Sequence, residues 1–444
     1  MSLDISFSLD SVREEMEKEK MNQTIIALII FITTLIFVSL EKINRTVIVL
    51  SGALIFILSK ILDQQEAFSS IDFNTIGLLT GMMVMVSIIK KTGLFQYLAI
   101  KISKLAKGNI FYLLFSISII SGVLSSILDN VTTIILIVPI TLAICENLEI
   151  SPVPLILSEI FASNIGGTAT LIGDPPNIII GSAGQLSFMD FIVNLAPFII
   201  VLLILLPFFI RLFFKKEMSR SASKNWQRIE KFDEKKAIED PFLLKKSLIS
   251  FFITIIVFIF HHNLGLEAAT VALSGATLLL LVSGIDPADS LLEVEWSTLF
   301  FFMGLFIIIA GVEKVGIIEW LSKKLIGLTQ ENLSLTTMVI LWVSALSCSF
   351  VNNISYTISM VPIIHNIGEA TSFNLNPIWW ALSLGACLGG NGTFIAAAAN
   401  LVGVNILKRQ GKTITFREFS RVGFPIMILS IILSSAYLYF RYLM

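Results

Sequence analysis

The feature that most constrains the fold is a repeat of the chain within itself. From Gly52 to Asn177, residues of the first half resemble those that lie 223 positions later, without a gap. The matched pairs include Gly52 with Gly275, Gly81 with Gly304, Asn130 with Asn353, Pro139 with Pro362, Gly166 with Gly389 and Asn177 with Asn400. A constant offset across such residues indicates a duplicated unit of about 190 residues.

Each unit is apolar enough to lie in a membrane. The 444 residues are 55% hydrophobic and 14% charged, with a mean hydropathy of +0.87, whereas soluble domains carry about 25% charged residues. The apolar runs are long enough for helices rather than barrel strands. We therefore predict an all-α polytopic membrane protein, and a net charge of −1 argues against a nucleic-acid partner.

The chain divides into four segments. They are a polar N-terminal segment 1–20, a first repeat 21–214, a charged linker 215–246 and a second repeat 247–444. Within the first repeat we predict spans at about 23–40, 44–60, 74–90, 153–180 and 190–213, the fourth of them broken. The stretch 109–147 has a polar tip and no hydrophilic loop, which favours a re-entrant helical hairpin and leaves two tight spans as the alternative.

Five spans in each repeat would invert the second repeat relative to the first. With the linker in the cytoplasm, loops on that side carry 21 Lys and Arg, and the opposite side carries 8, as the positive-inside rule requires. The exception is loop 284–294, which is acidic although it is placed on the cytoplasmic side. We predict ten spans in the cell membrane, with both termini outside and the two hairpins entering from opposite faces.

The stretch 166–177 interrupts one of these spans. It holds three glycines, Asp174 and the pair Pro175-Pro176, and two prolines in a helix interior break the helix. Broken backbone at membrane depth survives only where it is buried in protein or lines a cavity, so the break predicts a binding site. Asp174 before Pro175 also predicts a helix N-cap. The second repeat has its counterpart at 389–400.

Inverted repeats would bring the two hairpin tips and the two breaks together near the midplane. The candidate substrate- or ion-binding residues are Asp129, Asn130, Thr132, Gly167, Thr168, Thr170, Asp174, Asn177, Asn352, Asn353, Ser355, Asn391, Thr393 and Asn400. Their oxygen atoms suit a small cation such as sodium, for which Asn130, Thr132, Asn353 and Ser355 are the candidate ligands. Helix N-termini there would suit an anion instead. We expect no other cofactor.

Two carboxylates lie at membrane depth, both in the first half. The counterparts of Asp129 and Asp174 are Asn352 and Ala397. A charge at the bilayer centre costs ~3 kcal/mol, so each carboxylate is a candidate proton acceptor or cation ligand. The alternative is that both only cap helices. For Asp129 the role of proton acceptor or cation ligand is favoured, because asparagine would cap the helix equally well. For Asp174 both interpretations stay open.

Glu159 precedes the first break by about two turns. A carboxylate at this depth could line the ion path or face a polar partner within the helix bundle. Cys145, Cys348 and Cys387 have no CxxC spacing, which predicts buried structural thiols rather than a disulfide or metal framework.

Three motifs carry a family resemblance. They are Leu128–Thr133 with Pro139, Asn164–Asn177 and Gly389–Thr393. With them the chain resembles the ion-transporter superfamily, in the citrate-transporter-like group and the branch of arsenite permeases, NhaD-type sodium/proton antiporters and the pink-eyed dilution (P) protein. The resemblance implies a two-hairpin fold, a homodimer formed through scaffold helices and elevator-like alternating access.

The second half departs from the pattern of the antiporter-like members. Those often carry Asp-Asn in the second hairpin, where this chain has Asn352-Asn353. The second break usually resembles Leu-Ile-Gly-Ala-Ser-Ala-Asn, whereas residues 394–400 are Phe-Ile-Ala-Ala-Ala-Ala-Asn. Loss of a second carboxylate weakens the case for a second cation site and favours arsenite or another oxyanion over sodium/proton exchange.

These observations predict a secondary active ion transporter and not an enzyme. Sodium/proton antiport and proton-coupled arsenite or anion efflux compete, and sodium-coupled carboxylate (citrate-like) transport is the alternative. An intramembrane enzyme using Asp129 and Asp174 as an aspartyl pair, or a passive channel, fits the symmetric breaks less well. The expected partners are the lipid bilayer, a small ion or anion and a second copy. The chain has no GxxxxGK[ST] motif, so ATP would require a separate ATPase subunit.

Overall fold

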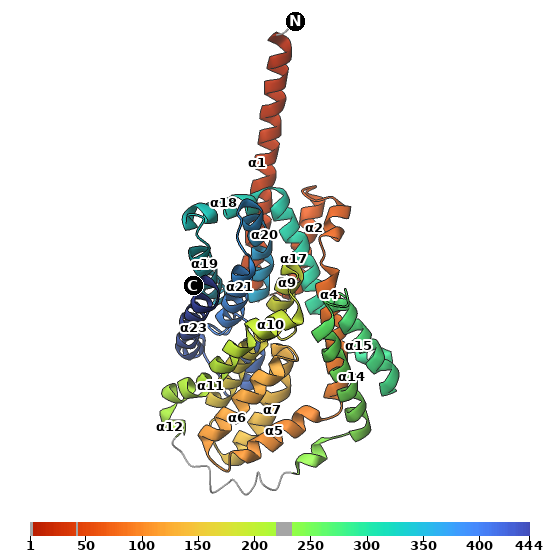
Figure 1. Ribbon diagram of the computed structural model, residues 1–444, viewed down its shortest axis with the longest axis vertical. Coiled ribbons are helices and arrows are strands. Elements are labelled where there is room, and N and C mark those ends of the chain that lie inside the picture. Colours follow the sequence, from red (N-terminus) through yellow and green to blue (C-terminus); the bar gives the residue numbers. More distant parts are fainter. Residues whose placement is uncertain (1–2, 41–42, 219–232) are drawn as a thin grey trace. The chain divides into compact units, whose positions relative to one another are not determined.

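The computed structural model describes residues 3–40, 43–218 and 233–444 (Figure 1). Within these ranges the regular elements are all helices, and no residue is in a strand. The all-α prediction is confirmed. Residues 219–232 of the predicted linker lie outside the described residues.

The helices of the first half precede the linker. In chain order they are α1 (Leu3–Leu40), α2 (Arg45–Leu58), α3 (Gln64–Ser69), α4 (Phe73–Lys90), α5 (Leu94–Leu105), α6 (Ile110–Ser125), α7 (Asn130–Leu148), α8 (Val153–Gly167), α9 (Pro175–Gly184), α10 (Phe188–Asn194), α11 (Ala196–Phe213) and α12 (Lys215–Met218). A short 3₁₀ helix, η1 (Glu234–Ala237), follows within the linker.

The helices of the second half follow η1. They are α14 (Pro241–Phe260), α15 (Ala268–Ser283), α16 (Pro287–Leu292), α17 (Trp296–Lys314), α18 (Ile317–Thr329), α19 (Leu333–Cys348), α20 (Asn353–Ala370), α21 (Asn376–Gly389), α22 (Ala398–Arg409), α23 (Phe416–Leu438) and η2 (Tyr439–Leu443). Each of the helices α17 to α22 begins 223 residues after its counterpart among α4 to α9. The duplication inferred from the sequence is therefore repeated in the helix boundaries.

Three local features add to the sequence prediction. Helix α1 runs without interruption from Leu3 to Leu40, so it includes most of the polar N-terminal segment 1–20 as well as the first apolar stretch. Helix α14 begins at Pro241, inside the predicted linker, because the Asp240 side chain accepts hydrogen bonds from the first N–H groups of the helix. The short helix α3 was not predicted, and Asp63 and Glu66 form a capping box at its start.

The chain forms two compact units, each of which draws on both repeats. The first unit contains residues 1–72, 296–331 and 358–373, and in it α17 packs against α1 and α2. The second contains residues 73–295, 332–357 and 374–444, and in it α4 packs against α14 and α15. Helices α4 and α17 are repeat counterparts, so each packs with helices from the other half of the chain.

The interior of the second unit is built around the two broken helices. Helix α6 packs along α8, and its counterpart α19 packs along α21 (Figure 1). Helices α8 and α21 also contact each other, and from Pro154 to Gly167 and from Pro377 to Gly389 every residue is buried. The breaks that end these helices are therefore held in the core of the unit.

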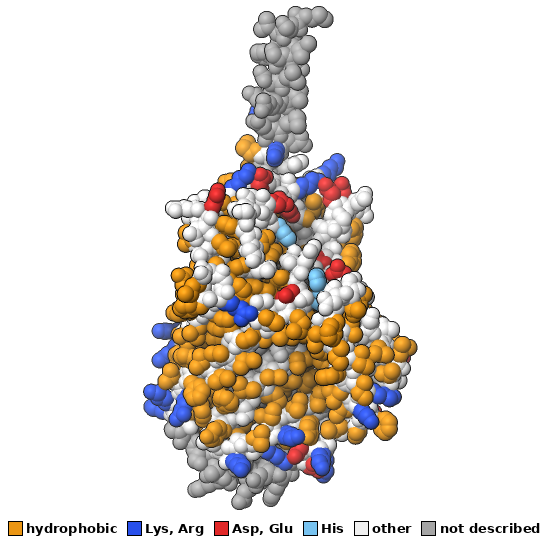
Figure 2. Space-filling view, in the orientation of Figure 1, with side chains coloured by type: hydrophobic (Ala, Val, Ile, Leu, Met, Phe, Trp, Pro, Cys, Tyr) orange, Lys and Arg blue, Asp and Glu red, His pale blue; other side chains and the backbone are white. Residues whose placement is uncertain are grey.

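Seven helical segments in the described residues are long and apolar enough to cross a membrane. They are Lys20–Val38, Phe73–Lys90, Asn130–Leu148, Ala196–Phe213, Pro241–Phe260, Trp296–Lys314 and Phe416–Leu443. Large apolar side chains such as Phe242, Phe252 and Leu281 are exposed, and Figure 2 shows hydrophobic side chains gathered over α14 and α15. Apolar surface of this extent marks contact with lipid, and the chain is a multi-pass membrane protein.

The first hairpin consists of α6 and α7, which pack against each other. Helix α6 has 16 residues and α7 has 19. At 1.5 Å per residue, α7 is nearly as long as the hydrocarbon core is thick, about 30 Å. Re-entry of the hairpin therefore stays a prediction, as does inversion of the second repeat.

The end of the linker is attached to α5 by an ion pair. Lys104 Nζ lies 2.5 Å from Glu234 Oε2, and the hydrogen bond from Lys104 lowers the pKa of Glu234. A carboxyl group whose folded-state pKa is lowered stabilises the fold above its unfolded pKa, and this contribution is lost as the pH falls through the folded pKa.

We expect Glu234→Gln to release this part of the linker at neutral pH. Residues near η1 should then be cleaved faster in limited proteolysis, and acidification of the wild type below pH 4, through the lowered pKa of Glu234, should have the same effect. Glu319→Gln is the control, because Glu319 forms its ion pair with Lys323 on its own helix. Equal cleavage of wild type and Glu234→Gln across this pH range would contradict the role of the pair.

Candidate functional site

The first break is a compact loop between α8 and α9. It covers residues 168–174, and a Cβ on Gly167 would lie 2.6 Å from the Gly173 carbonyl oxygen, so only glycine allows the chain to fold back this closely. Thr168 Oγ1 donates to the Asn164 carbonyl at 2.8 Å. The predicted interruption of the helix at 166–177 is confirmed.

An asparagine closes each break in the same way. Asn177 Nδ2 donates to the carbonyl oxygens of Thr168 and Thr170, at 3.1 and 2.9 Å. Its counterpart Asn400 Nδ2 donates to those of Gly390 and Thr393, at 2.6 and 2.9 Å. These carbonyls have lost their helical partners, and a buried carbonyl needs another donor. The two amide nitrogens therefore hold the loops in shape.

Both loops are also tied to the preceding hairpin. Thr170 Oγ1 donates to the Ser126 carbonyl, and Thr393 Oγ1 donates to the Ser349 carbonyl. The two threonines and the two serines are repeat counterparts. The candidate residues Thr170 and Thr393 thus fix each break to the end of α6 or α19.

The two breaks meet through a buried amide cluster. Asn164 Nδ2 donates to the side-chain oxygens of Asn391 and Asn400, each at 2.9 Å. Asn130 Nδ2, from the first hairpin tip, donates to Asn164 Oδ1 at 3.2 Å. All four residues are at most 4% exposed. The structure thus brings a predicted hairpin tip and the second break together around Asn164.

The second repeat makes the reciprocal contact with the first break. Ser383 Oγ donates to Asn177 Oδ1 at 2.6 Å, and Cys387 Sγ lies 3.6 Å from the same oxygen. Cys387 is the repeat counterpart of Asn164. Each broken helix therefore contacts the closing asparagine of the other.

The hairpin tips are capped by their own side chains. Asp129 is the N-cap of α7, and its carboxylate accepts hydrogen bonds from Thr132 N at 2.7 Å and Thr132 Oγ1 at 2.5 Å. Asn352 Oδ1 accepts from Ile354 N at 3.1 Å in the second hairpin. Asn353 and Ser355 are buried at the start of α20. The four-residue sodium site stays a prediction.

Asp174 is the buried carboxylate without a partner. It occupies the N-cap position of α9, with prolines at the first helical positions as predicted, but its side chain makes no capping hydrogen bond. The residue is 1% exposed, and neither carboxylate oxygen has a hydrogen-bond partner among the described residues. Of the two interpretations that were open for Asp174, capping by the side chain is the one that the structure does not show.

The surroundings of Asp174 indicate what this carboxylate can bind. Asp129 is close enough to interact with its charge, and the Cys387 thiol and the Asn130 amide are the nearby side-chain donors. An ionised carboxylate without a partner in a buried site is strongly disfavoured. Asp174 therefore requires a proton or a cation, and this requirement distinguishes it from Asp129, whose oxygens already accept two hydrogen bonds.

Glu159 has a polar partner within the bundle, which was one of the two interpretations. Thr141 Oγ1 donates to Glu159 Oε1, while Oε2 has no partner in the described residues. The three cysteines are buried and free, as predicted.

Three residues of the buried cluster were missed as site residues: Asn164, Ser383 and Cys387. Asn164 lies within a family motif, and its polar side chain precedes the break by less than a turn. The offset of 223 residues would then have pointed to Cys387. Ser383 carried no signal, because serine is common in apolar helices.

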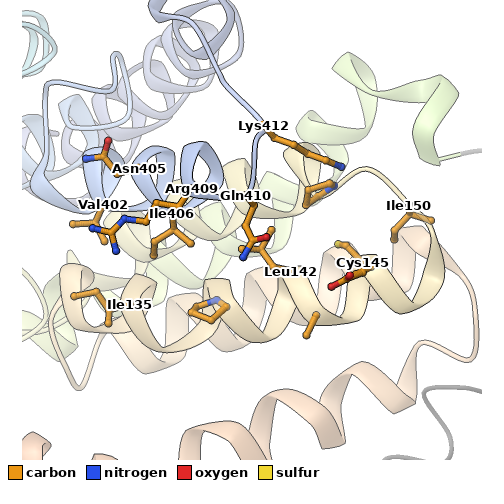
Figure 3. A pocket seen from close by; sticks show the side chains of 14 residues that line it. Ile135, Leu142, Cys145, Ile150, Val402, Asn405, Ile406, Arg409, Gln410 and Lys412 are labelled. Atoms are coloured by element: carbon orange, nitrogen blue, oxygen red, sulfur yellow. The ribbon is translucent and has the colours of Figure 1, made fainter.

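A separate cavity of about 880 Å³ lies between α7 and α22 (Figure 3). Its wall includes Ile135, Cys145 and Ile150 on one side and Arg409 and Lys412 on the other. None of the candidate site residues lines it.

A family model described as "Citrate transporter" matches residues 35–385. A 46 kDa membrane protein of Mycobacterium leprae is 37% identical over 430 residues, which cover 95% of this chain and 99% of that protein. The P protein of Homo sapiens is 33% identical over 446 residues, 83% of this chain and 53% of that protein.

Two solved transporter structures share the fold. The YdaH transporter of Alcanivorax borkumensis has a TM-score of 0.55 over 94% of this chain and 97% of its own. MtrF of Neisseria gonorrhoeae, described as illuminating a class of antimetabolite efflux pumps, has a TM-score of 0.60 over 94% of each chain. Both are 12% identical in sequence, so the likeness concerns the fold alone.

Proposed function

This chain belongs to the citrate transporter family of membrane transporters, and from that premise we propose that it is a secondary active ion transporter with Asp174 at its centre. The carried or coupling ion is a small cation exchanged for protons. The observation that carries this proposal is the buried Asp174 carboxylate without a hydrogen-bond partner. A site that must take up either a proton or a cation to be neutral alternates between the two.

The chemistry of the surrounding side chains supports a cation. The described contacts of the site involve two carboxylates, several amides, hydroxyl groups and a thiol, and none of the candidate residues is basic. Carboxylate and neutral oxygen atoms suit sodium or lithium, whereas an anion lacks a cationic side chain there. We therefore rank sodium/proton antiport first.

Proton-coupled efflux of arsenite is the second candidate, and Cys387 is the observation that favours it. Its thiol lies beside Asp174 and Asn177, and sulfur is a ligand for soft ions. Sodium-coupled uptake of a carboxylate such as citrate is a third candidate, for which only the helix N-termini at the breaks offer positive potential.

Transport in this proposal follows elevator-like alternating access. The matched breaks would carry the ion, and scaffold helices would hold two copies together as a homodimer. The linker would face the cytoplasm, with both termini outside the cell membrane. A recruited ATPase subunit is not needed, because one charge moved through 100 mV supplies ~2.3 kcal/mol.

The test uses everted vesicles or proteoliposomes that contain a pH-sensitive dye. Sodium, lithium, arsenite and citrate are added in turn to the wild type and to Asp129→Asn. We expect sodium or lithium to release protons, and Asp129→Asn to weaken the signal by about tenfold, because asparagine keeps the helix cap but removes a charge beside the site.

The responses to the four solutes distinguish between the three candidate transport functions. Arsenite movement that follows the proton gradient, without a cation response, would replace antiport by arsenite efflux. Uptake of citrate that requires sodium would establish the carboxylate alternative. No response to any of the four solutes, in vesicles that hold a proton gradient, would refute all three.

A further inference from the structure

Glu159 is a buried carboxyl group that the proposed function does not use. It lies on α8 and is 0% exposed. Thr141 Oγ1, on α7, donates to Glu159 Oε1, and Oε2 has no hydrogen-bond partner among the described residues. An ionised carboxylate in such a site is strongly disfavoured, because one neutral donor does not replace its hydration. A proton on Oε2 removes the charge, so these surroundings suit a protonated carboxyl group.

The fold does not require a carboxyl group at this position. The repeat counterparts of Glu159 and Thr141 are Leu382 and Ile364, and both are 0% exposed. Apolar side chains thus occupy both equivalent positions in the second repeat. Burial of a carboxyl group costs free energy, so the packing of α8 alone does not account for the polar pair.

Among the described residues, the helices around α8 bring no ion-pair partner to Glu159. Helix α8 packs against α6, α7, α11, α21 and α22. The ionisable side chains of these five helices are Tyr112, Cys145, Glu146, Arg211, Cys387, Lys408 and Arg409. None of them forms an ion pair or a hydrogen bond with Glu159 in the described part of the chain. A cation would need several further oxygen ligands, so a proton is the ligand that suits Glu159.

Cys145 connects Glu159 with the cavity between α7 and α22. It lines this cavity of about 880 Å³ and interacts electrostatically with both Glu159 and Lys412. Lys412 lines the cavity as well, on the opposite wall (Figure 3). Thr141 precedes Cys145 by one turn of α7, so both lie on the same face of this helix. One water molecule takes about 30 Å³ of liquid volume, so the cavity has room for water close to Glu159.

We propose that Glu159 is a proton-binding site of this protein, separate from Asp174, and that its proton exchanges with water through the cavity between α7 and α22. Glu159 precedes Asn164 by five residues, about 7.5 Å along the axis of α8, so it lies outside the amide cluster. The binding and exchange of this proton do not depend on the proposed function. Its use in transport rests on that function.

Infrared spectroscopy of the purified protein at pH 7 tests for the bound proton. A protonated carboxyl group has a C=O stretching band that a carboxylate lacks, and this band lies at high frequency where the proton has no acceptor. We expect Glu159→Gln to remove one such band, while the glutamine keeps an acceptor for Thr141. Glu146→Gln is the matched control, because Glu146 lines the same cavity but is exposed. Asp174→Asn should also leave this band in place.

Two results would overturn the proton site. One is that wild type and Glu159→Gln have identical spectra in this region. The other is that Asp174→Asn removes the same band, which would contradict a site separate from Asp174.

The exchange route is tested in D₂O, where replacement of the proton by deuterium shifts the band. A bulky maleimide on Asn405→Cys fills the cavity, because Asn405 is exposed and lines it, and the native cysteines are buried. We expect exchange at Glu159 to slow about tenfold or more, since it then requires local opening of the packed helices. Lys324→Cys with the same label is the control, because Lys324 is exposed on α18 and outside the cavity lining. Equal exchange rates for the two labelled variants would overturn the route.

The vesicle assay shows whether transport uses this proton. The side chain of Glu159→Gln binds no proton at Oε2, so we expect a several-fold lower maximal rate of sodium-driven proton release. The apparent KM for sodium should stay unchanged, because Glu159 lies outside the candidate ion site. An unchanged maximal rate would contradict the use of this proton in transport. No cation response in the wild type, with the infrared band present, would refute the proposed function and leave the proton site standing.

Discussion

Asp174→Asn is expected to abolish cation-dependent proton movement and to leave the protein at least as stable as the wild type. The carboxylate has no hydrogen-bond partner within bonding distance and makes no capping hydrogen bond, so the isosteric amide removes little stabilising contact. It removes a buried charge that costs ~3 kcal/mol at membrane depth. Loss of a charge in direct contact with a cation lowers its affinity by about 100-fold or more.

The measurement combines the vesicle assay with thermal unfolding of the purified protein. Asp190→Ala is the control, because Asp190 Oδ2 accepts hydrogen bonds from Ser187 N and Oγ in a capping box and lies outside the site. That variant should unfold at a lower temperature and still transport. Full transport by Asp174→Asn, or a marked fall in its unfolding temperature, would show that Asp174 is structural.

Gly166→Ala is expected to prevent stable folding of the second unit. A Cβ at Gly166 would lie 2.0 Å from the carbonyl oxygen and 2.4 Å from the Cα of Gly122. Both atoms belong to the backbone of α6, which packs against α8, so there is no side chain that can move aside. Overpacking typically costs 1–3 kcal/mol, and at this contact we expect about 3 kcal/mol or more.

A thiol-reactive dye measures this unfolding without added labels, because Cys145, Cys348 and Cys387 are buried. Gly389→Ala, the repeat counterpart, should have a smaller effect, since its Cβ would lie 2.7 Å from the nearest atom, the Ala345 oxygen. Gly327→Ala, with no atom within 4 Å of the added carbon, should be neutral or stabilising. Equal unfolding temperatures for all three would refute the close-contact account.

Much of the architecture was predictable because its signals are local. Prolines and glycines mark the break at 166–177. Because residues 223 positions later resemble those of the first half, each helix and break predicted there predicts a counterpart in the second half. The division into compact units was not predictable in this way, because it depends on which helices pack. Neither unit corresponds to a repeat.

The candidate site was predicted in part, and its two carboxylates show why. The sequence favoured Asp129 for function, whereas in the structure Asp129 caps its helix and Asp174 has no partner. The residues around Asp129 and those around Asp174 both have the pattern of a helix N-cap. Only the folded structure shows which of the two carboxylates makes the capping hydrogen bond. The contact of Asn164 with Asn391 joins residues 227 positions apart, and no local pattern indicates it.

The packing of α4 has a consequence for how the chain is made. Helix α4 ends at Lys90, and its packing partner α15 begins at Ala268. Ribosomes add about 5–20 residues per second, so α4 enters the bilayer roughly ten to forty seconds before α15 exists. During this interval the face that Gly81 presents to Ala272 is available to the insertion machinery. The packing of α4 is therefore completed only after synthesis has passed the midpoint of the chain.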